Sequence, residues 1–166
     1  MNTSSYRRGL FSIIREFSAI QKPAYEDLTS IGDHVFIMQS VHIPHDANIQ
    51  DHVTITPIVA LAGLTRILRG VFISMGATIH QRCVVGHYSI VGMGASVLKN
   101  IKPFLRYIPD KKLTVNKYAI KKFGFNGQTE EIVEYVLQCV SPQTKELLNI
   151  YREFTRLCEK STINKY

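Results

Sequence analysis

The stretch that decides the fold is residues 31–66, which in groups of six read IGDHVF IMQSVH IPHDAN IQDHVT ITPIVA LAGLTR. Each group begins with an aliphatic residue, and this spacing continues without a gap to residue 97. The positions are Ile31, Ile37, Ile43, Ile49, Ile55, Leu61, Ile67, Ile73, Ile79, Val85, Val91 and Val97. A period of six matches neither the turn of an α-helix nor the simple alternation of a β-strand. The pattern therefore predicts a solenoid of six-residue units.

A small or β-branched residue lies four positions after each of the first eleven aliphatic positions, from Val35 to Ala95. This pattern is typical of a coil with three flat faces, in which three groups of six make one turn of about 18 residues. The groups from residue 31 to residue 102 predict four coils, stacked at the strand spacing of about 4.8 Å. Ile14 and Ile20 indicate part of another coil, before an inserted loop at residues 23–28.

The six-residue pattern stops after Pro103, and helical spacing of apolar residues follows in residues 128–140. Ser141 and Pro142 match the N-cap and first position of a second helix. Its apolar stripe is Leu147, Leu148, Tyr151, Phe154 and Leu157. We therefore expect an all-β solenoid with an α appendage: a β-helix over 14–102, a basic connector over 103–127 and a C-terminal helical region over 128–160. The helices are expected to form a hairpin that caps one open end of the solenoid.

The composition limits the class of protein. The chain has 166 residues, 45% of them hydrophobic and 20% charged, which excludes the composition of a disordered protein. The longest apolar run, residues 58–64, is far shorter than the roughly 20 residues that cross a bilayer, so no transmembrane segment is expected. The three cysteines have no metal-like spacing and indicate a reduced, cytoplasmic protein without disulfides.

One column of the predicted coil carries polar residues that could do chemistry. Stepping along the chain by one coil at a time gives Asp27, His45, Gly63, Gln81 and Lys99. A histidine is suited to proton abstraction near neutral pH, and a glycine lets a backbone N–H approach a developing oxyanion. Asp46 could orient His45 or hold a substrate hydroxyl. These groups supply the parts for acyl transfer from a thioester to a hydroxyl or amine.

Two other interpretations of the histidines compete with this one. All six could be ordinary polar residues on the solenoid surface, where positions outside the aliphatic columns face solvent. A zinc site is not expected, because His42 and His45 have no cysteine or carboxylate at the usual ligand spacing.

Several short motifs carry a family resemblance. They are His42-Ile43-Pro44-His45-Asp46, Leu61-Ala62-Gly63, His80-Gln81, Val91-Gly92-Met93-Gly94 and Ile120-Lys121-Lys122-Phe123-Gly124-Phe125. In this order they resemble the acyl-carrier-protein-dependent UDP-N-acetylglucosamine O-acyltransferases that open lipid A biosynthesis. The similarity runs from about residue 14 to residue 140, and it implies that the β-helix is left-handed.

The resemblance also implies roles. His45 matches the general base, Asp46 a neighbour that contacts the sugar, and Gly63 the backbone oxyanion donor. Substrate-binding positions are His42, His80, Gln81, Met93, Asn116 and Lys122, and Met93 falls where a residue limits acyl chain length. The family implies a homotrimer in the bacterial cytoplasm, with sites between subunits and no bound cofactor or metal. Its co-substrates are acyl carrier protein, or coenzyme A, thioesters and a nucleotide sugar.

The chain departs from the family pattern at a few positions, and other functions stay open. Leu64 replaces a pocket histidine, Tyr118 replaces an acidic residue, and Lys122-Phe123 replaces a pair of arginines. A non-catalytic trimeric scaffold or regulatory subunit is therefore the alternative to an enzyme. Nucleic-acid binding is not expected, because the sequence shows no recognition helix or aromatics interleaved on a basic face.

The net charge of +7 is concentrated in one segment. Residues 99–122 hold eight basic residues and one acid, Asp110, whereas the rest of the chain is neutral. The segment is expected to dock an anionic acyl donor or a phosphorylated acceptor, unless it is a solvated connector.

Overall fold

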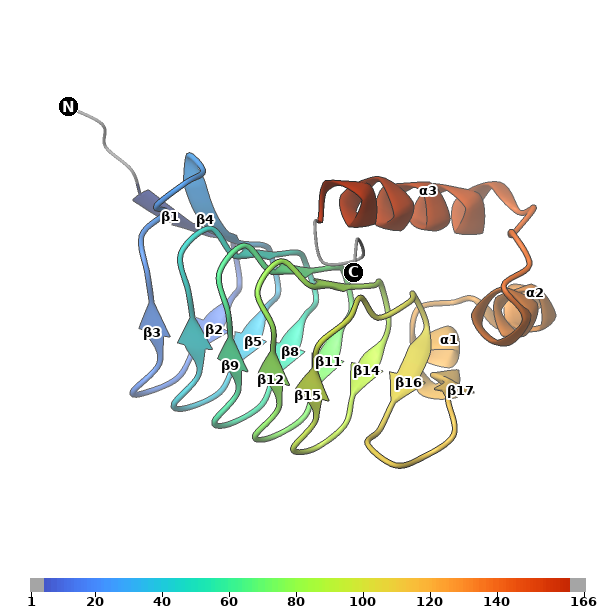
Figure 1. Cartoon of the computed structure of the whole chain (residues 1–166), viewed down its shortest axis with the longest axis horizontal. Coiled ribbons are helices and arrows are strands. Elements are labelled where there is room, and N and C mark those ends of the chain that lie inside the picture. The colour runs from blue at the N-terminus through green and yellow to red at the C-terminus, as the bar shows by residue number, and fades with distance from the viewer. Residues whose placement is uncertain (1–4, 162–166) are drawn as a thin grey trace.

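The computed structural model describes residues 5–161, which form a stack of coils followed by helices (Figure 1). The coils share three parallel sheets, one for each side of a triangular prism. Sheet A contains β1 (Ser5–Arg8), β4 (Leu28–Ile31), β7 (Asn48–Ile49), β10 (Arg66–Ile67) and β13 (Val84–Val85). Sheet B contains β2 (Ile13–Ile14), β5 (Phe36–Ile37), β8 (Thr54–Ile55), β11 (Phe72–Ile73), β14 (Ile90–Val91), β16 (Leu105–Tyr107) and β17 (Thr114–Val115). Sheet C contains β3 (Ala19–Ile20), β6 (His42–Ile43), β9 (Ala60–Leu61), β12 (Thr78–Ile79) and β15 (Ser96–Val97).

The register of the strands confirms the predicted length of the coil. Ile31 pairs with Ile49, and Ile49 pairs with Ile67, so that each aliphatic residue stacks on the equivalent residue of the next coil. All twelve predicted aliphatic positions are at most 3% exposed, and the small or β-branched residues from Val35 to Ala95 are also buried. Burial of these two sets of mostly apolar side chains inside the prism is therefore what holds the coils together.

A first coil precedes residue 28, in the region where Ile14 and Ile20 indicated one. Its strands pair with the next coil at a longer sequence offset than the regular coils, as between Ala19 and His42, because the loop after β3 is longer than the other turns. In this coil, Ser12 and Ser18 occupy the positions that small or β-branched residues hold in the regular coils. Their hydroxyls bond backbone groups of the second coil, including the N–H of Val35 at 3.0 Å and of Val41 at 3.2 Å.

Aromatic and histidine rings stack at the corner between sheets A and B. The rings of Phe11 and His34 lie 5.1 Å apart, and those of His34 and His52 lie 5.0 Å apart and almost parallel. The next position of this column is Gly70, where a Cβ would come within 2.5 Å of the ring of Tyr88. Phe123 packs on Tyr88 at 4.7 Å and closes the column from the helical end.

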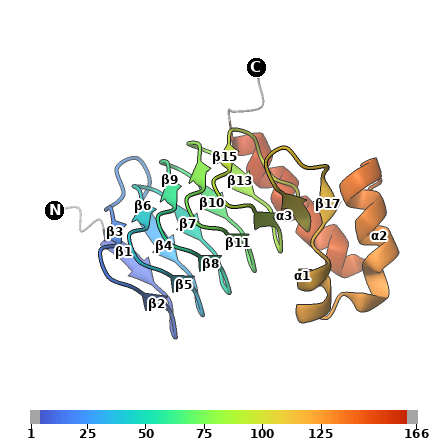
Figure 2. The same ribbon diagram turned by 90° about the horizontal axis from the view of Figure 1, so that it is seen from below.

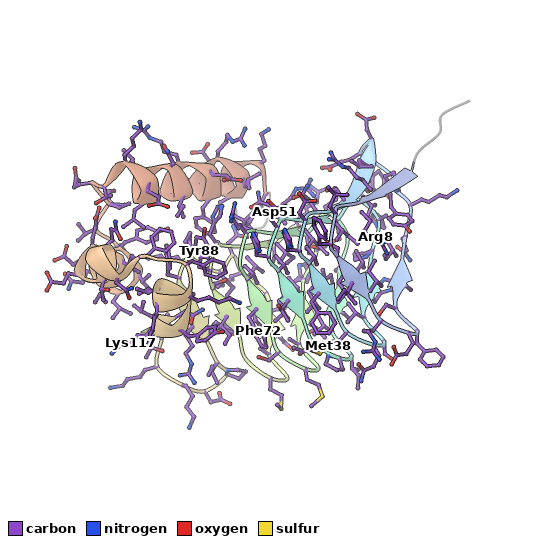
Figure 3. All side chains as sticks on the ribbon, turned by 180° about the vertical axis from the view of Figure 1, so that it is seen from behind. Arg8, Met38, Asp51, Phe72, Tyr88 and Lys117 are labelled. Atoms are coloured by element: carbon purple, nitrogen blue, oxygen red, sulfur yellow. The ribbon has the colours of Figure 1, made fainter. Side chains whose placement is uncertain are left out.

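The coils end differently from the sequence expectation. β16 pairs with β14 at a shorter offset than the regular coils, as between Ile90 and Arg106, and β17 then turns back antiparallel to β16. The segment 103–127, expected to be a connector, thus adds two strands, a short helix α1 (Lys117–Lys122) and the start of a 3₁₀ turn η1 (Asn126–Gln128). Figure 3 shows Tyr88 where the coils meet these helices.

The C-terminal region is helical, as predicted, but its boundaries differ. α2 (Thr129–Val133) runs into a π-helical turn η2 (Glu134–Gln138), whose wider turn displaces the apolar stripe and leaves Leu137 and Val140 exposed. The last helix, α3 (Lys145–Lys160), starts later than the expected N-cap at Ser141. The N-cap residue is Thr144, whose N–H, at 2.7 Å, and hydroxyl donate to the carboxylate of Glu131.

The expected cap of the solenoid involves α1 and α2 but not α3. Figure 2 shows α1 and α2 beyond the last coil, whereas α3 runs back beside the coils in Figure 1. Phe154 packs on Leu68 and Val84 of sheet A. Glu153 accepts hydrogen bonds from Gln50 at 2.7 Å and His87 at 3.2 Å. Among residues 5–161, no helix is long and apolar enough to span a membrane.

Candidate functional site

The polar column predicted through His45 lies at the corner between sheets C and A. The turns that follow β6, β9 and β12 carry His45, Gly63 and Gln81, and the pairing of His42 with Ala60 and of Ala60 with Thr78 stacks these turns. His45 therefore lies beside Gly63, with Gln81 two coils away. Asp27 does not extend this column, because the inserted loop shifts the first coil out of the regular register.

The ring of His45 rests on Gly63. A Cβ at position 63 would lie 2.5 Å from Cε1 and 2.8 Å from Nε2 of His45. The glycine is thus required by the close approach of the ring rather than by its backbone angles. Among the described residues, no acceptor lies on the Gly63 N–H, whereas the next N–H, of Leu64, donates to the His45 carbonyl at 3.2 Å.

His45 and Asp46 form a hydrogen-bonded pair. Nδ1 of His45 lies 2.8 Å from Oδ2 of Asp46. An ionised carboxylate can only accept, so Nδ1 of a neutral imidazole must carry the proton and Nε2 has the free lone pair. The imidazole is one-third exposed, whereas the carboxylate is fully buried. The pair therefore presents Nε2 of His45 to solvent as a base, while the buried Asp46 carboxylate fixes the orientation of the ring.

The surroundings of Asp46 keep its carboxylate ionised. Burial alone raises the pKa of this group, but hydrogen bonds from His45 and from three backbone N–H groups outweigh burial and hold the pKa below its ordinary value. The three donors are consecutive: Ala24 at 3.0 Å, Tyr25 at 3.1 Å and Glu26 at 2.9 Å. Because its oxygens are occupied inside the protein, Asp46 orients His45. The contact of Asp46 with a sugar, expected from the resemblance, stays a prediction.

Sequence reasoning missed the residues that hold this pair. The loop before β4 supplies the three N–H donors, and the ring of Tyr25 packs edge-on against His45 at 5.5 Å. Arg66, on β10, forms an ion pair with Glu26 and donates to the backbone carbonyl of Asp46 at 2.6 Å. The interruption of the six-residue pattern beside the His45 column was the available signal, since insertions in repeat proteins often lie on the binding face.

Two cavities adjoin this corner. One of about 480 Å³ lies between the loop and the end of α3, lined by Tyr25, Leu64, Arg66, Arg82, Leu157 and Lys160 among others. The other, of about 300 Å³, lies on sheet C and is lined by Ala60, Ala62, Thr78, His80, Ser96 and Leu98 among others. His80 and Gln81 are exposed, and His42 is partly exposed on β6. The structure thus groups His42, His80 and Gln81 along the same edge as His45.

The remaining predicted residues lie at the other two corners. Met93 is 66% exposed in the turn between β14 and β15, at the corner between sheets B and C. Lys122 lines a third cavity, of about 340 Å³, with His52, Asn116 and Phe123 at the corner between sheets A and B. Asn116 is buried there; its amide donates to the Tyr88 carbonyl at 2.8 Å and accepts from Ala119 as the cap of α1. One chain therefore does not bring Met93 or Lys122 to His45.

The basic segment lies at the helical end of the prism. Most of its basic side chains are exposed: Lys99, Arg106, Lys111, Lys112, Lys117, Lys121 and Lys122. Within residues 5–161, no group of three or more His, Cys, Asp or Glu side chains is placed to hold a metal ion.

These features define a class, the hexapeptide-repeat β-helix proteins, here with a His–Asp pair at one corner. No protein-family model matches the chain. The chain is similar in sequence to curated UDP-N-acetylglucosamine O-acyltransferases. It is 27% identical over 158 residues to the one from Pseudomonas putida, covering 93% of this chain and 60% of that protein. It is 31% identical over 124 residues to the one from Stutzerimonas stutzeri, covering 72% and 48% of the two chains.

A solved structure supports the same relationship. The crystal structure of Francisella novicida UDP-N-acetylglucosamine acyltransferase is 28% identical and has a TM-score of 0.75, covering 94% of this chain and 61% of that chain. The match confirms the left-handed β-helix with C-terminal helices. The chain spans about 60% of the length of the curated relatives it matches first.

Proposed function

We propose that the protein is an acyltransferase that moves an acyl group from a thioester to a hydroxyl or amine of a nucleotide sugar, as in lipid A synthesis. The observation that carries the proposal is the His45–Asp46 pair resting on Gly63. It provides a base with a free Nε2 next to a backbone N–H that no described residue accepts from. The names of the curated relatives support both substrates.

The residues act in a fixed order in this proposal. Nε2 of His45 takes the proton from the acceptor hydroxyl or amine as the heteroatom attacks the thioester carbonyl carbon. The carbonyl oxygen becomes an oxyanion, which accepts a hydrogen bond from the Gly63 N–H. When the carbon–sulfur bond breaks, the His45 imidazolium returns the proton to the leaving thiolate. Asp46 remains ionised throughout and stabilises the imidazolium, as its lowered pKa favours.

The proposed donor is an acyl carrier protein thioester, with acyl coenzyme A as the alternative, and no bound cofactor is involved. Acyl carrier proteins are acidic, and the segment 99–122 presents an exposed basic surface at the helical end. His42, His80 and Gln81 border the corner that carries the base, and we assign them to substrate binding. Met93 limits the acyl chain.

The proposed assembly is a homotrimer. Met93 and Lys122 lie at different corners from His45, so a second chain is needed to bring the three corners to one cleft. Packing of sheet B on sheet C of a second chain is supported by their residues: sheet B carries Ile13 and Phe72, which are 56% and 38% exposed, whereas sheet C carries the small residues Ala60 and Ser96. Figure 3 labels Phe72 and Met38 on β11 and after β5 of sheet B. The bacterial cytoplasm, where both thioester donors are made, is the proposed location.

The test is a screen of acyl carrier protein and coenzyme A thioesters of different chain lengths against UDP-N-acetylglucosamine and its amino analogue. Thiol release is followed together with the mass of the acylated sugar. Release that depends on the acceptor supports the enzyme. Absence of release with every pair would favour the non-catalytic scaffold, which the comparisons do not support. Native mass measurement tests the trimer in the same preparation.

A further inference from the structure

The loop between β3 and β4, together with the start of β4, is attached to the corner that carries His45 at three points. Its N–H groups at Ala24, Tyr25 and Glu26 donate to the Asp46 carboxylate. The side-chain carbonyl of Gln21 accepts from the His45 N–H at 3.1 Å. Beyond the loop, the hydroxyl of Thr29 accepts from the Asp46 N–H at 2.9 Å. The segment that breaks the repeat is thus built around the carboxylate that supports the base.

Arg66 joins this loop to the turn that contains Asp46. One nitrogen of its guanidinium donates to the Asp46 carbonyl at 2.6 Å, and another pairs with the carboxylate of Glu26. The Arg66 side chain is 19% exposed, whereas that of Glu26 is 43% exposed. A planar guanidinium can hold two acceptors from different segments in a fixed geometry, which a lysine ammonium does less well.

Through Glu26, the ion pair is connected to the Asp46 carboxylate. Glu26 supplies one of the three N–H donors to Asp46, and its side chain is the group that Arg66 holds. If the loop moves away, the carboxylate loses up to three hydrogen bonds and its fixed orientation. Nδ1 of His45 then loses the acceptor that selects its tautomer.

We propose that Glu26 and Arg66 are positioning residues for His45: their ion pair keeps the loop closed on Asp46, which keeps the proton on Nδ1 and the lone pair on Nε2. The proposal rests on the proposed function only for its kinetic readout. Neither residue touches the reacting atoms, so both act through Asp46.

The test uses the full chain with Arg66→Ala, Glu26→Ala, the double variant and Arg66→Lys. Nitrogen chemical shifts of the His45 ring, measured by NMR, report the tautomer directly. We expect a single Nδ1–H tautomer in the wild type and a mixture in the two alanine variants. We also expect kcat to fall about tenfold to a hundredfold with KM changed less than about threefold, because misplacement by an ångström costs rate rather than affinity. The double variant should lose no more than Arg66→Ala alone, since Arg66→Ala already removes both the ion pair and the hydrogen bond to the Asp46 carbonyl.

The controls separate this role from a structural one. Arg69→Ala removes an exposed arginine from the same coil and should leave both readouts unchanged. Glu26→Gln keeps a hydrogen-bonding side chain at an exposed position and gives a second, milder variant if an alanine variant does not fold. Arg66→Lys should restore part of the rate. A lower melting temperature with an unchanged tautomer and unchanged kcat would overturn the proposal. If the wild type transfers no acyl group at all, the proposed function fails, and the tautomer measurement still decides the role of the ion pair.

Discussion

The imidazole of His45 stacks on the backbone of Gly63 one coil away, so closely that position 63 has no space for a side chain: a Cβ there would lie 2.5 Å from Cε1. This contact fixes the height of the base above the N–H that we assign to the oxyanion. It also makes the glycine sensitive to the smallest possible substitution.

Gly63→Ala should reduce kcat by about a hundredfold, because the methyl group forces the His45 ring off its position by about an ångström. The measurement is steady-state thiol release with an acceptor present. Gly127→Ala is the matched control, since a Cβ at position 127 meets nothing within 4 Å. Full activity of Gly63→Ala would show that the ring position seen here is not the reactive one.

If the proposed acyl transfer holds, Met93→Gly should shift the preference of the protein toward acyl chains about two to four carbons longer. Each additional methylene of the acyl chain that is buried contributes about 0.8 kcal/mol to binding. Removing the Met93 side chain leaves space that these methylenes can fill. Competition between thioesters of different length measures the shift. Met93→Leu conserves the volume and should leave the preference in place. An unchanged preference in Met93→Gly would remove Met93 from the acyl site.

His52→Phe should make the folded state less sensitive to acid. Burial, together with the positive charges of Arg69, His34 and Lys122, lowers the pKa of His52 below 6.5, while Asp51 opposes this. The unfolded chain therefore binds a proton more readily, and stability falls as the pH drops below about 6.5. Phenylalanine fits a column that already holds Phe11 and Tyr88. Melting temperatures at pH 8 and pH 5.5 should differ less in the variant than in the wild type, and an equal difference would count against the effect.

Glu153→Gln should weaken the docking of α3 on sheet A in a pH-dependent way. The hydrogen bond from His87, followed by that from Gln50, lowers the pKa of Glu153 to about 2 despite partial burial. Its contribution is present above its ordinary pKa of 4.5 and is lost as the pH falls toward 2. The wild type should melt above the variant at pH 7, and the gap should narrow below pH 4.5. Glu159→Gln, exposed on the same helix, should show no such gap.

The repeat made most of the fold and part of the site predictable. Because every regular coil has the same length, counting along the sequence is enough to place Gly63 beside His45. The same arithmetic failed for Asp27, where an inserted loop interrupts the period. The N–H groups that surround Asp46 were not predictable, since they belong to a loop whose backbone follows no period. The start of α3 was missed because Glu131, from another helix, binds the chain at Thr144, directly before the first helical residue.

The ion pair of Glu26 and Arg66 illustrates the same limit. Arg66 is an outward position of a strand in the regular pattern and would be taken for a solvated charge. Its role is visible only when the inserted loop brings Glu26 to it from a distant part of the sequence. Regular spacing thus predicts which residues share a corner, whereas irregular segments determine how the reactive group is held.

The most direct test of the central claim compares wild type and His45→Ala in acyl transfer from an acyl carrier protein thioester to UDP-N-acetylglucosamine. Circular dichroism and melting of the variant confirm that the coils persist, as expected because His45 is not one of the inward positions. We expect acceptor-dependent thiol release by the wild type and a loss of at least about a hundredfold in folded His45→Ala. Equal rates in the two proteins would contradict the claim.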